Sequence, residues 1–259
     1  MTETVPGSTV GLVSDVEIED DATYYSRRHA EIYDFIHAAR GRDWAGESDE
    51  LAERVRAVKP DADSLLDVAC GTGAHLARLA DHFSVTAGFD LSEGMCDMAR
   101  RNAPRATITS GDMRTFRAER TYDAVVCMCF SLGYMKDREE LEAAVAVMAD
   151  CLAPGGVVIA EPWWFPENFL DGFVSGGIAE KPGLVVSRVS HTVREGNATR
   201  MSVNYTVAES RGIRSFAEQE LYTLFELDEY LAAFAAAGLR AEYEPGGPSG
   251  RGLFTAVRA

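Results

Sequence analysis

The chain has 259 residues, 46% of them hydrophobic, and a formal charge of −16 from 25 Lys and Arg against 41 Asp and Glu. This length and apolar content predict one domain of about 200 residues with an addition, or two unequal domains, around a packed core. So acidic a surface repels phosphate backbones, which argues against nucleic acid and anionic membranes as partners. The negative net charge does not exclude one small anionic ligand that is bound by a few local arginines.

The five cysteines are odd in number and lie in apolar stretches, as expected of reduced core residues in a cytoplasmic protein. Cys127 and Cys129 are too close for a usual zinc pair and have no accompanying His or Cys pair, so we expect no metal site. Residues 1–21 lack the segments of a signal peptide, and we expect them to be flexible. No apolar run approaches the length that spans a membrane.

Helical patterns come first in the chain, beginning near Tyr24 and again over about 49–58. Strands then alternate with helices, which is typical of βαβ units and a parallel sheet. The expected strands are 64–68, 84–90, 106–110, 122–127 and 156–161, and the expected helices are 74–82, 93–102 and 139–152.

The pattern changes after Phe169, where three β-like runs are separated by turn-forming residues. They predict an antiparallel meander inserted into the sheet domain. The three runs are 184–194, 199–209 and 213–224. A helix over 227–237 follows, and the last two strands are too close for a crossover helix, so they must pair antiparallel. These last strands are 240–244 and 252–257.

The most informative stretch joins the first strand of the sheet to its helix. Leu65 and Leu66 precede an acid at Asp67, and a tight turn with Gly71 and Gly73 then opens the helix. Glycines without side chains let a ligand approach the backbone closely. Asp67 would repel a phosphate but suits a ligand with an ammonium group, which favours S-adenosylmethionine (SAM) over a dinucleotide. The alternative is a glycine turn of the kind found in any α/β protein.

Two further acids follow the next two strands. Asp90 comes 23 residues after Asp67, where a carboxylate accepts hydrogen bonds from ribose hydroxyls. Asp112, followed by Met113, offers an acceptor for an adenine amino group and an apolar side chain for the ring face. Open α/β sheets bind ligands at the carboxyl ends of their strands, so the three aspartates predict one cofactor site. Each alone could be a solvated loop acid.

These residues make the chain resemble the class I SAM-dependent methyltransferases, although Ala69 stands where most of them have a glycine. Four stretches resemble more narrowly the N-methyl- and N,N-dimethyltransferases that act on TDP-linked amino sugars in antibiotic pathways. The stretches are 66–73, 161–169 with its pair Trp163-Trp164, 187–191 and 246–254. The resemblance covers the chain from about residue 25 to its end.

The resemblance implies an α/β, Rossmann-like fold with a seven-stranded, mostly parallel sheet, and a homodimer. Residues 22–62 would form helices that cover the active site, 63–169 and 226–259 the SAM-binding sheet domain, and 170–225 a β insertion that binds substrate. The cofactor site would comprise Tyr33, Arg40, Asp67, Ala69, Gly71, Gly73, Asp90, Leu91, Met95, Asp112, Met113 and Met128. The substrate site would comprise Tyr25, Trp163, Trp164, Arg188, Ser190, His191 and Arg251.

Two arginines and the tryptophan pair carry the expected acceptor. Arg188 and Arg251 would hold the diphosphate with planar charged donors, and Ser190 would add a hydroxyl. For Trp163 and Trp164 the alternative is a rigid hydrophobic plug between prolines. For Arg188 and Arg251 the alternative is that each is an ordinary charged residue on the surface or at a sheet edge.

Tyr134 and Tyr25 are the expected catalytic residues. The family often has a histidine after the fourth strand as base, and Tyr134 stands there in this chain. Because a tyrosine of pKa about 10 is a poor base near neutrality, we expect Tyr134 to orient the substrate and catalysis to rest on approximation. His191 and Glu161 are fallback bases. The substitution also leaves open whether the amine is at C-3 or C-4 of the sugar.

The sequence thus predicts a SAM-dependent N-methyltransferase of a TDP-linked 3- or 4-amino deoxyhexose, adding one or two methyl groups. Two alternatives stay open. One is an N- or O-methyltransferase of another small metabolite, such as an amino acid or a polyketide aglycone. The other is a catalytically inactive binding protein with the same fold.

Overall fold

A computed structural model describes residues 17–18 and 25–258. Its larger part is built on a seven-stranded sheet of order β11-β12-β6-β5-β2-β3-β4, which is parallel except where β12 pairs with β11 and β6. The strands are β2 (Ser64–Val68), β3 (Val85–Asp90), β4 (Thr107–Ser110), β5 (Tyr122–Cys127), β6 (Leu152–Ala160), β11 (Leu239–Glu244) and β12 (Leu253–Arg258).

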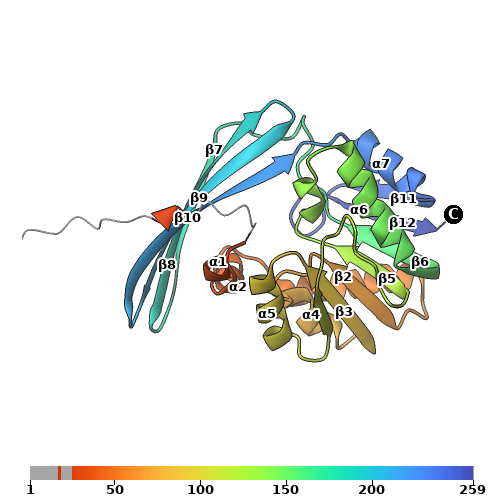
Figure 1. Ribbon diagram of the computed structural model, residues 1–259, viewed down its shortest axis with the longest axis horizontal. Coiled ribbons are helices and arrows are strands. Elements are labelled where there is room, and N and C mark those ends of the chain that lie inside the picture. The colour runs from red at the N-terminus through yellow and green to blue at the C-terminus, as the bar shows by residue number, and fades with distance from the viewer. Residues whose placement is uncertain (1–16, 19–24, 259) are drawn as a thin grey trace, which may run out of the picture.

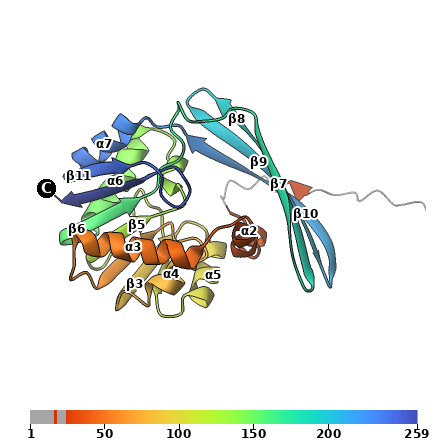
Figure 2. The same cartoon turned by 180° about the vertical axis from the view of Figure 1, so that it is seen from behind.

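Each central strand of this sheet sends alternate side chains into two apolar layers, because both faces are covered by helices. Leu65 packs with Leu51 and Leu76 on one face, whereas Leu66 packs with Leu141 on the other. The first layer holds α3 (Trp44–Val58), α4 (Ala74–Leu79) and α5 (Glu93–Asn102), and the second holds α6 (Arg138–Asp150) and α7 (Leu227–Ala236). Figure 1 shows α6 in front of the sheet, and Figure 2 shows α3 from behind.

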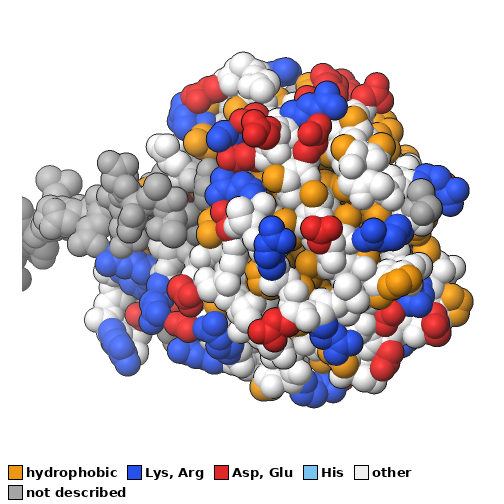
Figure 3. Space-filling view, turned by 45° about the vertical axis from the view of Figure 1, so that its right-hand side comes forward, with side chains coloured by type: hydrophobic (Ala, Val, Ile, Leu, Met, Phe, Trp, Pro, Cys, Tyr) orange, Lys and Arg blue, Asp and Glu red, His pale blue; other side chains and the backbone are white. Residues whose placement is uncertain are grey.

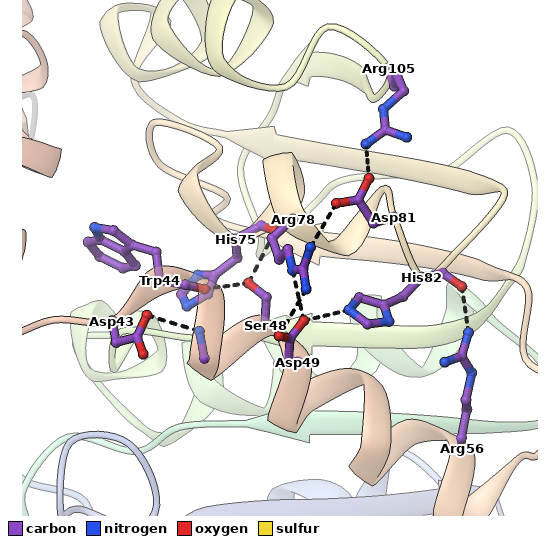
Figure 4. A network of polar contacts seen from close by, with 11 residues as sticks. Asp43, Trp44, Ser48, Asp49, Arg56, His75, Arg78, Asp81, His82 and Arg105 are labelled. Carbon is purple, nitrogen blue, oxygen red and sulfur yellow. Dashed lines mark hydrogen bonds and ion pairs between the residues drawn. The ribbon is translucent and has the colours of Figure 1, made fainter.

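Polar contacts also join α3 to α4 (Figure 4). Arg78 Nε donates to Asp49 Oδ1 at 2.8 Å, and the ring of His82 lies 2.6 Å from the same oxygen. Ser48 Oγ donates to the backbone carbonyl of His75 at 3.3 Å. The first turn of α3, which carries Trp44, is thereby held against the start of α4.

A second sheet stands beside this α/β body, with α1 (Arg27–Ala30) and α2 (Tyr33–Ala39) between the two (Figure 1). Its order is β1-β10-β9-β8-β7, and the pairs are antiparallel except β1 with β10. The strands are β1 (Glu17–Ile18), β7 (Phe173–Lys181), β8 (Leu184–Glu195), β9 (Ala198–Glu209) and β10 (Gly212–Thr223). Ile32 and Ile36 pack against Val203 and Tyr205, which fixes the helices to the inner face of this sheet.

The predicted fold class is confirmed, since the structure has a mostly parallel seven-stranded sheet and an antiparallel β insertion. The last two strands of the chain, β11 and β12, pair antiparallel as expected. The insertion has one more strand than expected, because β7 contains Gly176 and Gly177 and gives no clear β pattern. The expected start of the second helix near 49 was wrong, since α3 begins at Trp44 behind the cap Asp43. The expectation of a flexible segment over 1–21 lies outside the described residues, apart from the short strand β1.

Candidate active site

A first cavity of about 130 Å³ lies at the carboxyl ends of the central parallel strands. Tyr25 and Tyr134 line it. It also brings together ten of the residues expected at the cofactor: Tyr33, Asp67, Ala69, Gly71, Asp90, Leu91, Met95, Asp112, Met113 and Met128.

Three residues of the turn beneath this cavity have positive φ angles, in the left-handed region of backbone conformation. Ala69 has φ +56°, Gly71 +54° and Gly73 +75°. Ala69 therefore adopts a conformation that a glycine takes without strain. Gly73 does not line the cavity, contrary to expectation, but a Cβ there would lie 3.0 Å from Ala99 Cα. It is needed for the close packing of α4 on α5.

Asp67 places an unpartnered carboxylate in the first cavity. The residue is 2% exposed and its Oδ2 has no hydrogen-bond partner. Burial, with the nearby Asp90, raises the pKa of Asp67 to about 7. A buried carboxylate of this kind needs a cation or a donor to offset its lost hydration, which an ammonium group would provide.

The other two aspartates are held in different ways. Asp90 accepts hydrogen bonds from the backbone N–H groups of Gly71 at 2.9 Å and Ser92 at 2.8 Å, which fixes its carboxylate beside the turn. Burial raises the pKa of Asp90. Asp112 is bound by Arg114, whose Nε lies 2.9 Å from Oδ1, and this guanidinium lowers the pKa of Asp112. Asp112 is thus preoriented by an arginine that sequence reasoning did not include.

A second cavity, of about 470 Å³, lies between α1, α2, the inner face of the antiparallel sheet and the Trp163 loop. Tyr25 and Tyr33 line both cavities, so the two meet at these rings. Six of the seven residues expected at the substrate line this second cavity: Tyr25, Trp163, Trp164, Arg188, Ser190 and Arg251.

Buried donors in the second cavity lack acceptors. Arg188 Nη1 donates to Ser190 Oγ at 2.8 Å, but its Nε has no partner, and the same is true of Arg251 Nε and Trp163 Nε1. The Arg251 guanidinium lies over the rings of Trp163 at 4.8 Å and Trp164 at 4.5 Å. In the part of the chain that the structure describes, neither arginine has a carboxylate in ion-pair range. Such donors fit an anionic ligand.

Arg40 lies in this second cavity and not at the cofactor, which corrects the expectation. Burial, followed by repulsion from Arg188, lowers the pKa of Arg40. Burial, followed by repulsion from His29, Arg40 and Arg188, also holds the pKa of His37 well below its usual value. Burial is the main cause of both shifts, and the neighbouring cations add to it.

His191 does not reach the cavity. Side chains alternate along β8, so Arg188, Ser190 and Thr192 are buried on the inner face and His191 is exposed on the outer one. The expectations that His191 binds substrate or serves as a fallback base are therefore wrong for the site within this chain. Glu161, the other fallback, is fully buried and accepts from the backbone N–H of Cys129 at 2.7 Å, which is a structural role.

A chain of phenols occupies the boundary between the cavities. The hydroxyl of Tyr134 lies 2.6 Å from that of Tyr25 and 2.6 Å from that of Tyr222, and Tyr222 bonds Glu220. Sequence reasoning missed Tyr222 and Glu220. The sequence pattern that could have identified them is the alternation of side chains along β10. It places Glu220 on the same face as the buried rings of Phe216 and Tyr222.

Comparison with known proteins identifies the class of this site. A family model described as a methyltransferase domain matches residues 65–156. A dTDP-3-amino-3,4,6-trideoxy-alpha-D-glucopyranose N,N-dimethyltransferase of Streptomyces venezuelae is 55% identical over 236 residues, 91% of this chain and 100% of the relative. The chain belongs to the SAM-dependent N,N-dimethyltransferases of dTDP-linked amino sugars.

Two further relatives are also similar to this chain. A dTDP-4-amino-2,3,4,6-tetradeoxy-D-glucose N,N-dimethyltransferase of Saccharopolyspora spinosa is 51% identical over 246 residues, 95% of this chain and 98% of the relative. The solved structure of SAM-bound CalS10, an amino pentose methyltransferase from Micromonospora echinaspora, matches with a TM-score of 0.81 at 43% identity over 92% of this chain and 99% of that one.

These matches confirm that the chain is a SAM-dependent methyltransferase of class I. The residues at the first cavity fit SAM, because the orphaned Asp67 carboxylate needs a cation. Among residues 17–18 and 25–258, no helix is both long and apolar enough to cross a membrane.

Proposed function

We propose that this enzyme transfers one or two methyl groups from SAM to the amino group of a TDP-linked 3- or 4-amino deoxyhexose. The observation that carries the proposal is the second cavity, with its unpartnered donors on Arg188 and Arg251, which opens at Tyr25 and Tyr33 onto the cofactor cavity. A nucleotide-linked sugar has the length and the anionic diphosphate that such a cavity accepts.

SAM supplies an electrophilic methyl group on a sulfonium. Asp67 would hold its ammonium group, Asp90 its ribose hydroxyls and Asp112 its adenine amino group, while Met113 and Met128 would contact its apolar parts. Gly71 and Ala69 would leave room for the ligand along the turn. Leu91, Met95 and Tyr33 complete this lining.

Arg188 and Ser190 from β8, with Arg251 from the loop before β12, would bind the diphosphate. Arg40 would add a fourth donor from the end of α2. Trp163 and Trp164 would pack against the sugar and the base, with the Arg251 guanidinium stacked between ring and anion. Two or three local arginines can thus hold an anion in a protein of charge −16.

Tyr134 and Tyr25 would orient the acceptor amine at the junction of the cavities. Burial raises the pKa of both hydroxyls well above 10, so neither removes a proton by ionising near neutrality. Catalysis would rest mainly on holding the nitrogen in line with the methyl group, which can supply up to ~7–11 kcal/mol. Helices α1 and α2 would cover both ligands, which excludes water from the reacting atoms.

The test is methyl transfer itself. The enzyme is incubated with SAM and a panel of TDP-3-amino and TDP-4-amino deoxyhexoses, and methyl additions are counted by mass spectrometry. We expect one or two additions on at least one sugar. Failure with the whole panel, together with methylation of a free amino acid or aglycone, would contradict the proposal.

We further propose that the enzyme works in the cytoplasm as a homodimer. The five cysteines are free thiols, as suits a reducing compartment. The outer face of the antiparallel sheet exposes a group of apolar side chains, which a second copy of the chain would cover: Val174, Ile178, Val189, Ile213 and Leu221. Light scattering should give a dimer that Ile178→Lys weakens, whereas Val58→Lys on α3 leaves it intact.

A further inference from the structure

Glu220 is a buried acid at the junction of the two cavities. It is 6% exposed, lies on the inner face of β10 and lines the second cavity. Its carboxylate bonds the hydroxyl of Tyr222, and its Oε2 is 3.4 Å from the hydroxyl of Tyr134. Tyr134 also lines the cofactor cavity, so a continuous row of oxygen atoms joins that cavity to Glu220.

The groups that face Glu220 come from six elements, namely α1, α2, the short helix Ser131–Tyr134, β8, β9 and β10, and from the segments on either side of α1 and α2. Besides the phenols these are the histidine His29, the arginines Arg40 and Arg188, and the carboxyl group of Glu218. The phenols are Tyr25, Tyr33, Tyr134, Tyr205 and Tyr222. Burial raises the pKa of every one of these phenols, so they stay neutral near pH 7. Burial also raises the pKa of Glu220, against the opposing effect of His29. Glu220 is thus the one carboxyl group in a row whose other members are neutral phenols.

A substrate amine has to lose a proton for each methyl group that it gains. An ammonium nitrogen has no lone pair to attack with, and a nitrogen that has just been methylated is again an ammonium. Residues of α1 and α2 line the site, and a proton acceptor within the protein would assist each turnover there. The second methylation depends on it most, because the monomethyl product has to be deprotonated again.

We propose that Glu220 is the acceptor of the amine proton, which reaches it through Tyr134 and Tyr222; this rests on the proposed N-methyltransferase function. One N–H bond breaks, and its proton passes to the Tyr134 oxygen as the Tyr134 proton passes to Tyr222. The Tyr222 proton forms the new O–H bond on Glu220. Both phenols end neutral, the Glu220 carboxylate becomes an acid, and the nitrogen keeps its lone pair.

Glu220 also has a way to return the proton to solvent. Oxygen atoms of Glu218 and Glu220 and a ring nitrogen of His29 lie within 4.8 Å of one another. His29 Nδ1 is 2.5 Å from Glu218, whose side chain is 13% exposed. Ser26 Oγ donates to the other Glu218 oxygen at 2.6 Å. The cluster therefore leads from the buried carboxylate towards the surface.

The decisive variant is Glu220→Gln, which keeps the size of the side chain and cannot take up a proton. At pH 7 we expect kcat to fall roughly 10- to 100-fold. This is at or below the lower end of the rate effects that general acid–base groups have in enzymes. The KM for SAM should be unchanged, and monomethyl product should accumulate. The deficit should shrink as pH rises, because solvent then takes the proton. Glu220→Asp should recover part of the rate.

Glu180→Gln is the matched control, since it makes the same change at an exposed position of the same sheet and should keep wild-type rates. If Glu220→Gln does not fold, Tyr222→Phe interrupts the same row and should show the same pH-dependent deficit. Wild-type kcat and a wild-type pH profile in the variant would overturn the proposal. Loss of activity with EDTA and its restoration by a divalent cation would overturn it too, since His29, Glu218 and Glu220 would then be a metal site.

These outcomes are separable from failure of the proposed function. If the wild-type enzyme methylates a different amine and no TDP-amino sugar, the proposed substrate is wrong, and the Glu220 comparison is made on that amine.

Discussion

The buried carboxylate of Asp67 makes cofactor affinity depend on pH. Its pKa is raised to about 7, and binding an ammonium group requires the ionised form. Below pH 7 the cofactor therefore has to displace a proton, and its affinity should fall by about tenfold per pH unit towards pH 5.5. Calorimetry of SAM binding between pH 5.5 and 7 measures this slope. Asp67→Asn should bind roughly 10- to 100-fold more weakly at pH 7, with no slope over this range. An equal slope in both proteins would contradict the assignment.

Arg188 and His191 stand three residues apart on β8 and point to opposite faces. Arg188→Gln removes a charged donor from the second cavity, so KM for the TDP-sugar should rise by about 10- to 100-fold. His191→Ala should leave KM unchanged, since its side chain faces outward. Steady-state kinetics with varied TDP-sugar distinguishes the two. Equal effects of both substitutions would mean that the inner face does not bind the nucleotide.

Tyr134→Phe tests whether positioning dominates catalysis. The ring keeps its packing against Tyr222 and Tyr25, and only the hydroxyl is lost. We expect kcat to fall by about one to two orders of magnitude, with KM little changed. A loss of several more orders with binding intact would show that the hydroxyl does the essential chemistry.

Residues near one another in sequence were the predictable part of the site. Asp67, Gly71, Asp90 and Asp112 follow successive strands, so the parallel sheet brings them to one edge. Glu220 and Tyr222 reach Tyr134 across 86 and 88 residues through the pairing of β10, which local patterns do not reveal. Arg40 was assigned to the wrong ligand because the sequence does not say which side of α2 faces which cavity.

At the scale of elements, the strands and helices that could be predicted were those with a clear pattern of apolar residues. β2 is buried at all five positions, and its apolar residues Leu65, Leu66 and Val68 indicate a buried strand. β7 is an edge strand with two adjacent glycines, and nothing in its sequence distinguished it from a loop. The helix expected from Tyr24 is divided into α1 and α2, with Tyr25 before them at φ +63°, and such a break follows from packing on the sheet.

Gly88 on β3 makes room for the glycine turn. A Cβ there would lie 2.6 Å from Leu76 Cδ1 and 2.8 Å from Cys70 Cβ. Gly88→Ala should lower the free energy of unfolding by about 1–3 kcal/mol through overpacking and weaken SAM binding. Gly177→Ala on β7 meets nothing within 4 Å and should cause no loss. Urea denaturation with and without SAM measures both effects, and equal stability of the two variants would contradict this packing account.

For the whole molecule, charge is separated between the surface and the substrate cavity. On the face drawn in Figure 3, Asp and Glu side chains are interspersed with Lys and Arg. Arg40, Arg188 and Arg251 all line the substrate cavity, and there burial, with smaller contributions from His29, Arg40 and Arg188, lowers the pKa of His37. The composition predicted an acidic protein with a few local arginines, but not that the end of α2, strand β8 and the loop before β12 would bring three of them to one cavity.

The relation of the β insertion to the sheet domain could not be read from the sequence. It depends on α1 and α2, whose Ile32 and Ile36 pack on the insertion while Tyr25 and Tyr33 face both cavities. The central claim is that these parts form one site, with donor and acceptor meeting at the tyrosines.

A crystal structure of the enzyme with S-adenosylhomocysteine and TDP tests that claim most directly. We predict the amino group of the cofactor product on Asp67 and the TDP diphosphate within hydrogen-bond distance of Arg188 and Arg251. The sulfur should point towards Tyr25 and Tyr134. A diphosphate bound elsewhere, with these arginines still unpartnered, would contradict the account.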